Sequence, residues 1–78
     1  MKYERNEVAK MIMNILSESE DYLTVKEITH ELWKQNVEDV EPQQVVFLIK
    51  TILRGKVFSR INSHSRERYY STDPDIER

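Results

Sequence analysis

The chain contains a single glycine, Gly55, and the pattern of its side chains changes at that residue. Before it, apolar residues recur at the three- and four-residue spacings of amphipathic helices. After it, two short runs rich in β-branched and aromatic residues, at 56–61 and 68–71, flank a polar stretch. We therefore expect a mostly helical α+β domain, in which three helices are followed by a β-hairpin.

The first two helices are predicted from an apolar stripe and from a capping signal. The stripe within residues 4–17 consists of Val8, Met11, Ile12, Ile15 and Leu16. Residues 17–21 break this period and are expected to form a loop. Thr24 and Glu27 have the spacing of a capping box, in which each side chain accepts the other residue's backbone N–H. The second helix should therefore begin after Thr24, bury a stripe of Val25, Ile28 and Leu32, and end near residues 35–36.

The third helix is expected to run from Pro42 to Gly55, after a polar connector at 36–41. Proline suits the first turn of a helix, where its missing N–H leaves no hydrogen bond unmade. Gly55 stands where a left-handed residue would end the helix. The expected core stripe of this helix is Val45, Leu48, Ile49, Ile52 and Leu53.

The length of 78 residues allows one small domain, which we assign to residues 1–72, with 73–78 as a frayed polar tail. The absence of cysteine excludes disulfides and thiolate metal sites. No apolar run approaches the roughly 18 residues of a membrane span, and the first residues are too polar to begin a signal peptide. We expect a soluble protein of the cytoplasm, associated with the nucleoid if the source is bacterial or archaeal.

Charge is distributed unevenly along the chain. Residues 1–41 carry five basic groups and ten acidic ones, whereas 42–72 carry six basic groups and one acid, Glu67. Such asymmetry indicates a localised surface for an anion, most often nucleic acid. The six cations of the second segment are Lys50, Arg54, Lys56, Arg60, Arg66 and Arg68.

In this order of elements, residues 5–72 resemble the winged helix-turn-helix family. The resemblance depends on LTVKEITHEL at residues 23–32, which is typical of the family's second helix, and on residues 55–61 leading to RERYY at 66–70. One departure is the connector at 36–41, which is longer than the roughly three- to four-residue turn of a tight helix-turn-helix. Longer links occur in winged helices, so this departure leaves the expected fold intact.

The resemblance implies that the third helix enters the major groove and that the hairpin contacts the backbone or the minor groove. Glutamine can hydrogen-bond adenine bidentately, and lysine or arginine can bond guanine. Cations on the hairpin can neutralise phosphates, whose contacts dominate affinity. The candidate DNA-binding residues are Gln43, Gln44, Phe47, Lys50, Thr51, Arg54, Lys56, Arg60, His64, Arg66 and Arg68.

Several of these residues also have purely structural explanations. Cations near a helix C-terminus, such as Lys50 and Arg54, favour the helix dipole. Arginines on an edge strand discourage aggregation, and His64 can be a solvated loop residue. Val46 and Phe47 lie beside the core stripe and can pack on the hairpin, meet a partner protein or contact thymine methyl groups. Trp33 is expected at the edge of the core, and one of Tyr69 and Tyr70 should be buried.

The chain has no catalytic signature, and we expect no enzyme activity, cofactor or metal. His30 and His64 lack metal-ligand spacing, and no glycine-rich phosphate loop or nucleophile elbow occurs. The leading hypothesis is a small transcriptional regulator that binds double-stranded DNA. A homodimer through the first helix is plausible, with contacts near its surface from Tyr3, Met11 or Met13.

Two other functions remain open. A winged-helix adaptor would bind a protein partner through Val46 and Phe47 and would not bind DNA. RNA binding is the weaker option, because the aromatic residues that could stack on single-stranded bases are few and unclustered in the sequence.

Overall fold

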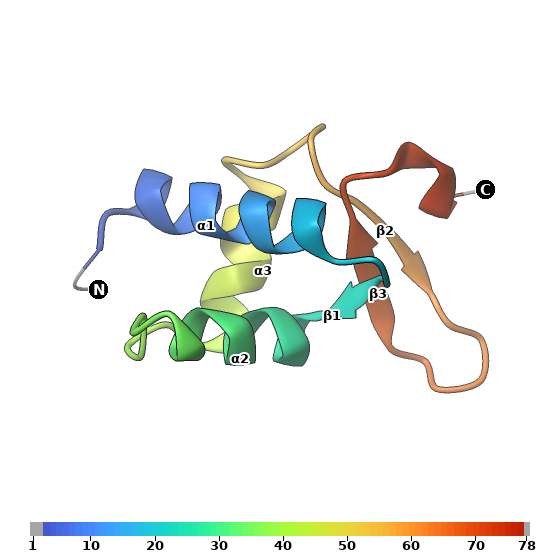
Figure 1. The fold of residues 1–78 in the computed structure, drawn as a ribbon. Coiled ribbons are helices and arrows are strands. Elements are labelled where there is room, and N and C mark those ends of the chain that lie inside the picture. Colours follow the sequence, from blue (N-terminus) through green and yellow to red (C-terminus); the bar gives the residue numbers. More distant parts are fainter. Residues whose placement is uncertain (1–2, 78) are drawn as a thin grey trace.

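The computed structural model describes residues 3–77. It is an α+β fold in which the helices lie together and the hairpin projects from them, as Figure 1 shows. The predicted order of three helices and a hairpin is confirmed. The elements are α1 (Arg5–Glu18), β1 (Leu23–Thr24), α2 (Val25–Lys34), α3 (Pro42–Lys50), β2 (Phe58–Ile61), β3 (Arg68–Ser71) and the 3-10 helix η1 (Pro74–Glu77).

The strands form one antiparallel sheet in the order β1-β3-β2. Strand β3 lies in the centre, where Tyr69 is paired with Arg60 of β2 and with Thr24 of β1. The short strand β1 was not predicted, because its two residues merge with the capping signal of α2. Its pairing ties the start of α2 to the hairpin, which is far away in the sequence.

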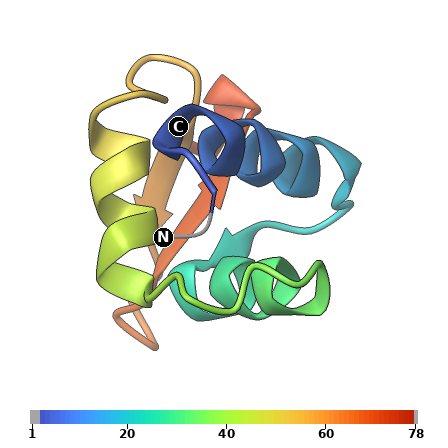
Figure 2. The same ribbon diagram turned by 90° about the vertical axis from the view of Figure 1, so that its left-hand side faces the viewer.

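The core lies between the three helices and one face of the sheet. Figure 2 shows α1 and α3 along two sides of the molecule, with α2 below and the strands behind. The predicted stripes supply most of the buried residues, which include Val8, Ile12, Ile15, Leu16, Ile28, Leu32, Val45, Leu48, Ile49 and Tyr70. Met11 and Val25 are only half-buried. The expectation that one of Tyr69 and Tyr70 is buried is confirmed for Tyr70.

The capping box of α2 is present. The Glu27 N–H donates to Thr24 Oγ1 at 3.3 Å, and the Thr24 N–H donates to Glu27 Oε1 at 3.1 Å. The connector after α2 was expected to be polar, but its two valines, Val37 and Val40, are fully buried. Trp33, which was expected at the edge of the core, is 44% exposed, and its Nε1 donates to the Val40 carbonyl at 2.9 Å.

Helix α3 is shorter than predicted. It begins at Pro42 but ends at Lys50, where the Thr51 hydroxyl donates to the Phe47 carbonyl at 2.7 Å. Turns follow up to Gly55, which has the expected left-handed backbone (φ 81°). The helical spacing of apolar residues therefore does not apply after Lys50, the last residue of α3. Ile52 was therefore wrongly assigned to the core and is 37% exposed, whereas Leu53 is buried as expected.

The predicted frayed tail is also wrong for most of its length. Residues 74–77 form η1, which contacts β2 and β3, and its apolar residue Ile76 is only 1% exposed. Hydrogen bonds lead into this turn, since the Asp73 N–H donates to Ser71 Oγ at 3.0 Å. One isoleucine is too weak a periodic signal to predict such docking. Within residues 3–77, no helix combines the length and apolar character required to cross a membrane.

Candidate nucleic-acid interface

A groove of about 540 Å³ lies between the C-terminal half of α3 and the hairpin. It brings together three of the predicted cations, Lys50, Arg54 and Arg68, from α3, the following turn and β3. None of its lining residues is acidic. The remaining lining residues are Val46, Ile49, Gly55, Val57, Ser59 and Tyr70.

Local structure holds the cations around this groove. Lys50 is the last residue of α3, and Arg54 lies in the turn, where it forms a β-bridge with Val57. On the hairpin, an Arg68 guanidinium nitrogen donates to Ser59 Oγ at 2.9 Å, across the two strands. Three separate elements therefore place positive charge around one hollow.

Tyr70 forms an uncharged part of the groove wall. Burial raises the pKa of its phenol above the usual value, and the positive charge of Arg68 opposes that rise. The phenol is therefore neutral at neutral pH, and it adds no negative charge beside the cations.

The N-terminal half of α3 differs from this cationic end. The Gln44 side chain accepts the Glu41 N–H at 2.8 Å, and the Gln43 amide donates to Glu41 Oε2 at 2.6 Å. Both glutamines predicted to read bases thus contact an acidic residue at the helix start. Phe47, in the middle of the helix, is 51% exposed and has the Arg5 guanidinium 5.5 Å from its ring centroid.

The other hairpin candidates lie away from the groove. Arg60 and His64 line a second hollow together with Tyr22 and Tyr69. Lys56 and Arg66 are exposed and line neither hollow, and Arg66 has a left-handed backbone (φ 60°). The predicted cations therefore do not share one surface, because three of them line the groove, Arg60 lines the second hollow, and two line neither.

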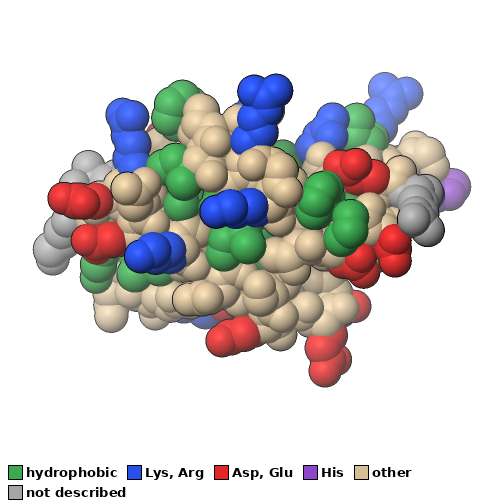
Figure 3. Space-filling view, turned by 90° about the horizontal axis from the view of Figure 1, so that it is seen from above, with side chains coloured by type: hydrophobic (Ala, Val, Ile, Leu, Met, Phe, Trp, Pro, Cys, Tyr) green, Lys and Arg blue, Asp and Glu red, His purple; other side chains and the backbone are tan. Residues whose placement is uncertain are grey.

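Figure 3 shows how the charged side chains are distributed on one face of the molecule. Lys and Arg side chains gather in the upper half of that view, with hydrophobic side chains between them. Most Asp and Glu side chains lie toward the lower edge and the two ends. The upper half of this view is therefore mainly a mixture of cations and apolar groups.

The residues proposed for a dimer contact are only partly exposed. Tyr3, Met11 and Met13 are partly buried and pack against the core. The exposed positions of α1 are Arg5, Asn6, Glu7, Lys10, Asn14, Ser17 and Glu18. A second copy that docked on these positions would have to bury polar and charged groups, which is unfavourable without paired partners.

Sequence reasoning missed Ser59, Val57 and Tyr70 as groove residues, and Tyr22 as a neighbour of Arg60. The missing information was the strand register. Once Ser59 is paired with Tyr70, alternation along the strands places both on the side of α3. Tyr22 lies near Arg60 because it immediately precedes the unpredicted strand β1, which pairs with β3.

Within the described part of the chain, no cluster of three or more His, Asp or Glu side chains is suited to hold a metal ion. Comparison with models of protein families, with curated proteins and with solved structures found no match for this chain. Functional inference therefore depends on the geometry of its own residues.

Proposed function

We propose that this chain is a winged-helix domain that binds double-stranded DNA and acts as a small transcriptional regulator. The order of three helices and a hairpin agrees with the resemblance found in the sequence. The observation that carries the proposal is the convergence of Lys50, Arg54 and Arg68 around a groove without acidic side chains. Backbone phosphates are the groups that such a set of cations would bind.

In this proposal, the C-terminal half of α3 and the turn after it approach the duplex, and the α3 side of the hairpin clamps the backbone. Lys50 and Arg54 would supply phosphate or guanine contacts. Arg68 is already held in place by Ser59, so less side-chain entropy is lost when it binds a phosphate. Glu41 repels phosphate from the N-terminal end of α3, which favours docking through the opposite end.

The salt dependence of binding tests this proposal. Three phosphate contacts predict a fall in affinity of about 40-fold between about 50 and 200 mM salt. Binding of a labelled duplex would be followed by fluorescence anisotropy for the wild type and for Arg54→Ala. The variant should bind more weakly, and its logarithmic salt slope should be smaller by about 0.9.

Lys34→Ala is a matched control, because it also removes one exposed positive charge. Lys34 lies on α2 and is paired with Glu31 at 3.2 Å, outside the groove. It should leave the duplex affinity and the salt slope unchanged, and circular dichroism would confirm that both variants fold. Absence of duplex binding at low salt, or equal losses in the two variants, would refute the proposal.

A second candidate function is favoured by one observation, the exposure of Phe47. This ring is half exposed on α3, and Ile52 is exposed shortly after it. A protein partner with an apolar surface could cover both side chains. The duplex titration at low salt distinguishes the two functions, because an adaptor of this kind would bind no duplex even there.

A further inference from the structure

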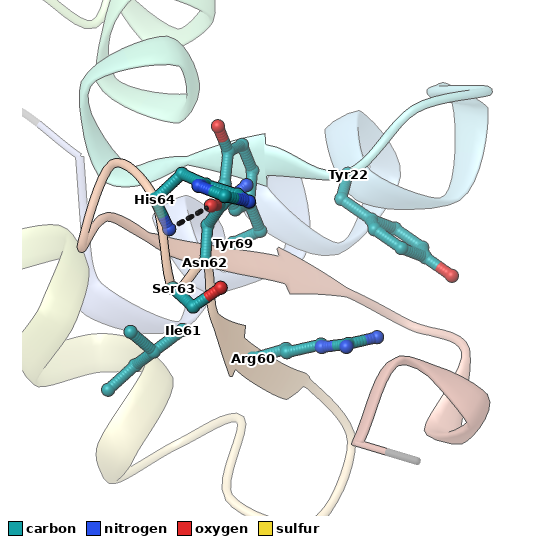
Figure 4. Close-up of a pocket in the computed structure, with 7 residues that line it drawn as sticks. All are labelled: Tyr22, Arg60, Ile61, Asn62, Ser63, His64 and Tyr69. Atoms are coloured by element: carbon teal, nitrogen blue, oxygen red, sulfur yellow. Dashed lines mark hydrogen bonds between the residues drawn. The ribbon is translucent and has the colours of Figure 1, made fainter.

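A second hollow, of about 510 Å³, lies beside the hairpin and is separate from the proposed duplex groove. Tyr22, Arg60, His64 and Tyr69 line it, together with residues of the hairpin tip (Figure 4). The proposed duplex contacts use none of these side chains. The proposed duplex binding therefore does not account for this hollow.

The register of the sheet brings its two tyrosines and its arginine together. Tyr69 is paired directly with Arg60 on one side and with Thr24 on the other, and directly paired residues share one face. Tyr22 immediately precedes β1 and lines the same hollow as Arg60 and Tyr69. Tyr22 and Tyr69, which are far apart in the sequence, thus line one hollow together with Arg60.

These side chains are available to a ligand. Tyr22 is 45% exposed, and no hydrogen bond or ion pair engages the Arg60 guanidinium among residues 3–77. The hairpin tip is ordered by Asn62, whose Oδ1 accepts the backbone N–H groups of His64 at 2.8 Å and Ser65 at 3.3 Å. Figure 4 shows this tip contact and the extended side chains of Tyr22 and Arg60.

Charge limits where an anionic ligand can lie. Tyr22 also lines a neighbouring hollow, and there it is accompanied by three acids, Glu20, Asp21 and Asp73. None of the residues that line the Arg60 hollow is acidic. An anion would therefore be attracted to the Arg60 side of Tyr22 and repelled from the other side.

We propose that this hollow binds unpaired nucleotides of a nucleic-acid strand. One base would stack on Tyr22 and another on Tyr69, and a phosphate of the strand would bind Arg60. Aromatic platforms combined with cations are the means by which proteins hold single strands without reading their sequence. The site lies on the opposite face of the hairpin from the duplex groove, so the two proposals can fail independently.

Anisotropy titration of a labelled oligothymidylate, about eight nucleotides long to suit a small site, tests the proposal. Tyr22→Ala and Tyr69→Ala should each weaken binding about tenfold, whereas Tyr22→Phe, which keeps the ring, should bind like the wild type. Arg60→Ala should reduce the logarithmic salt slope by about 0.7, and Lys34→Ala should not change it. Tyr22 lies in an exposed loop, so its variants stay informative if Tyr69→Ala fails to fold.

Duplex binding measured on the same variants separates this proposal from the first. Tyr22→Ala should keep the duplex affinity of the wild type. The nucleotide site would be refuted if oligothymidylate fails to bind at low salt, or if Tyr22→Ala binds it as tightly as Tyr22→Phe. A loss in Arg68→Ala with none in Arg60→Ala would also refute it, because the strand would then lie in the duplex groove.

Discussion

Arg60 and Arg68 lie on neighbouring strands of the hairpin but belong to opposite faces of the sheet. Arg60 is paired with Tyr69, whereas Arg68 is paired with Ile61, and alternation along the strands sends the two arginines to different sides. Arg68 is held by Ser59 beside α3, and Arg60 lies near Tyr22. The hairpin therefore presents positive charge on two surfaces that need not serve the same ligand.

A pair of charge-removing variants should distinguish these two faces. Arg68→Gln should weaken duplex binding and reduce the logarithmic salt slope by about 0.9, the share of one phosphate contact. Arg60→Gln removes the same charge from the other face and should leave the duplex slope unchanged. Anisotropy titrations at several salt concentrations measure both slopes. Equal effects of the two variants would show that the duplex does not distinguish the faces.

The sequence predicted those parts of the fold that depend on local signals. The capping box at Thr24 and the proline at 42 located the starts of α2 and α3, and the apolar stripes identified most of the core. The single glycine correctly marked a left-handed position. It did not mark the end of α3, because the helix ends at Lys50 and turns connect it to Gly55.

The remaining features depend on contacts between distant segments. Strand β1 exists because Leu23 and Thr24 pair with Tyr70 and Tyr69, and nothing near residue 23 specifies that pairing. The same holds for Ile76, whose burial depends on contact between η1 and the sheet. The charge count predicted one basic segment, but the division of its arginines between two faces of the hairpin follows from the strand register, which a charge count does not contain.

Loss of the α2 cap should destabilise the domain moderately. Thr24→Ala removes the hydroxyl that accepts the Glu27 N–H, and such a loss typically costs about 1 kcal/mol in the free energy of unfolding. Thr24→Ser keeps the hydroxyl and should retain most of the stability. Urea denaturation followed by circular dichroism measures the difference. A serine variant as unstable as the alanine variant would indicate that the strand position of Thr24, rather than its cap, is important.

Ile76 should contribute strongly to stability although it lies near the end of the chain. Ile76→Ala leaves a cavity beneath η1 and should lower the free energy of unfolding by about 2 kcal/mol or more. The neighbouring exposed Glu77 provides the control, since Glu77→Ala should have little effect. Both values come from urea denaturation. A negligible change for Ile76→Ala would mean that η1 is not stably docked in solution.

Gly55 should be sensitive to substitution because of its backbone alone. Its φ is 81°, and an added Cβ would meet no atom within 4 Å. Gly55→Ala should therefore destabilise the domain by about 1 kcal/mol through backbone strain, without a steric clash. Gly55→Asn should cost less, since asparagine adopts the left-handed conformation more readily. Equal unfolding midpoints for glycine and alanine would show that the turn relaxes to a negative φ.

Alkaline pH should destabilise the domain in part through Tyr70. Burial raises the pKa of this phenol, so above about pH 10 the unfolded chain loses a proton that the folded chain keeps. At lower pH the phenol is protonated in both the folded and the unfolded chain, so it adds no pH dependence to the free energy of unfolding. That free energy falls as the pH rises from about 10 through the pKa of the folded state. Tyr70→Phe removes the titrating group and should flatten this decline in urea denaturation measured at increasing pH.

Arg68 supplies a second check on the same linkage, because its charge lowers the pKa of Tyr70 and so opposes the effect of burial. Arg68→Gln should therefore raise that pKa further and make the alkaline loss of stability larger than in the wild type. Combined with Tyr70→Phe, the same substitution should no longer change the alkaline slope. A pH dependence identical in the wild type and in Tyr70→Phe would mean that the phenol is as well solvated in the folded state as in the unfolded chain.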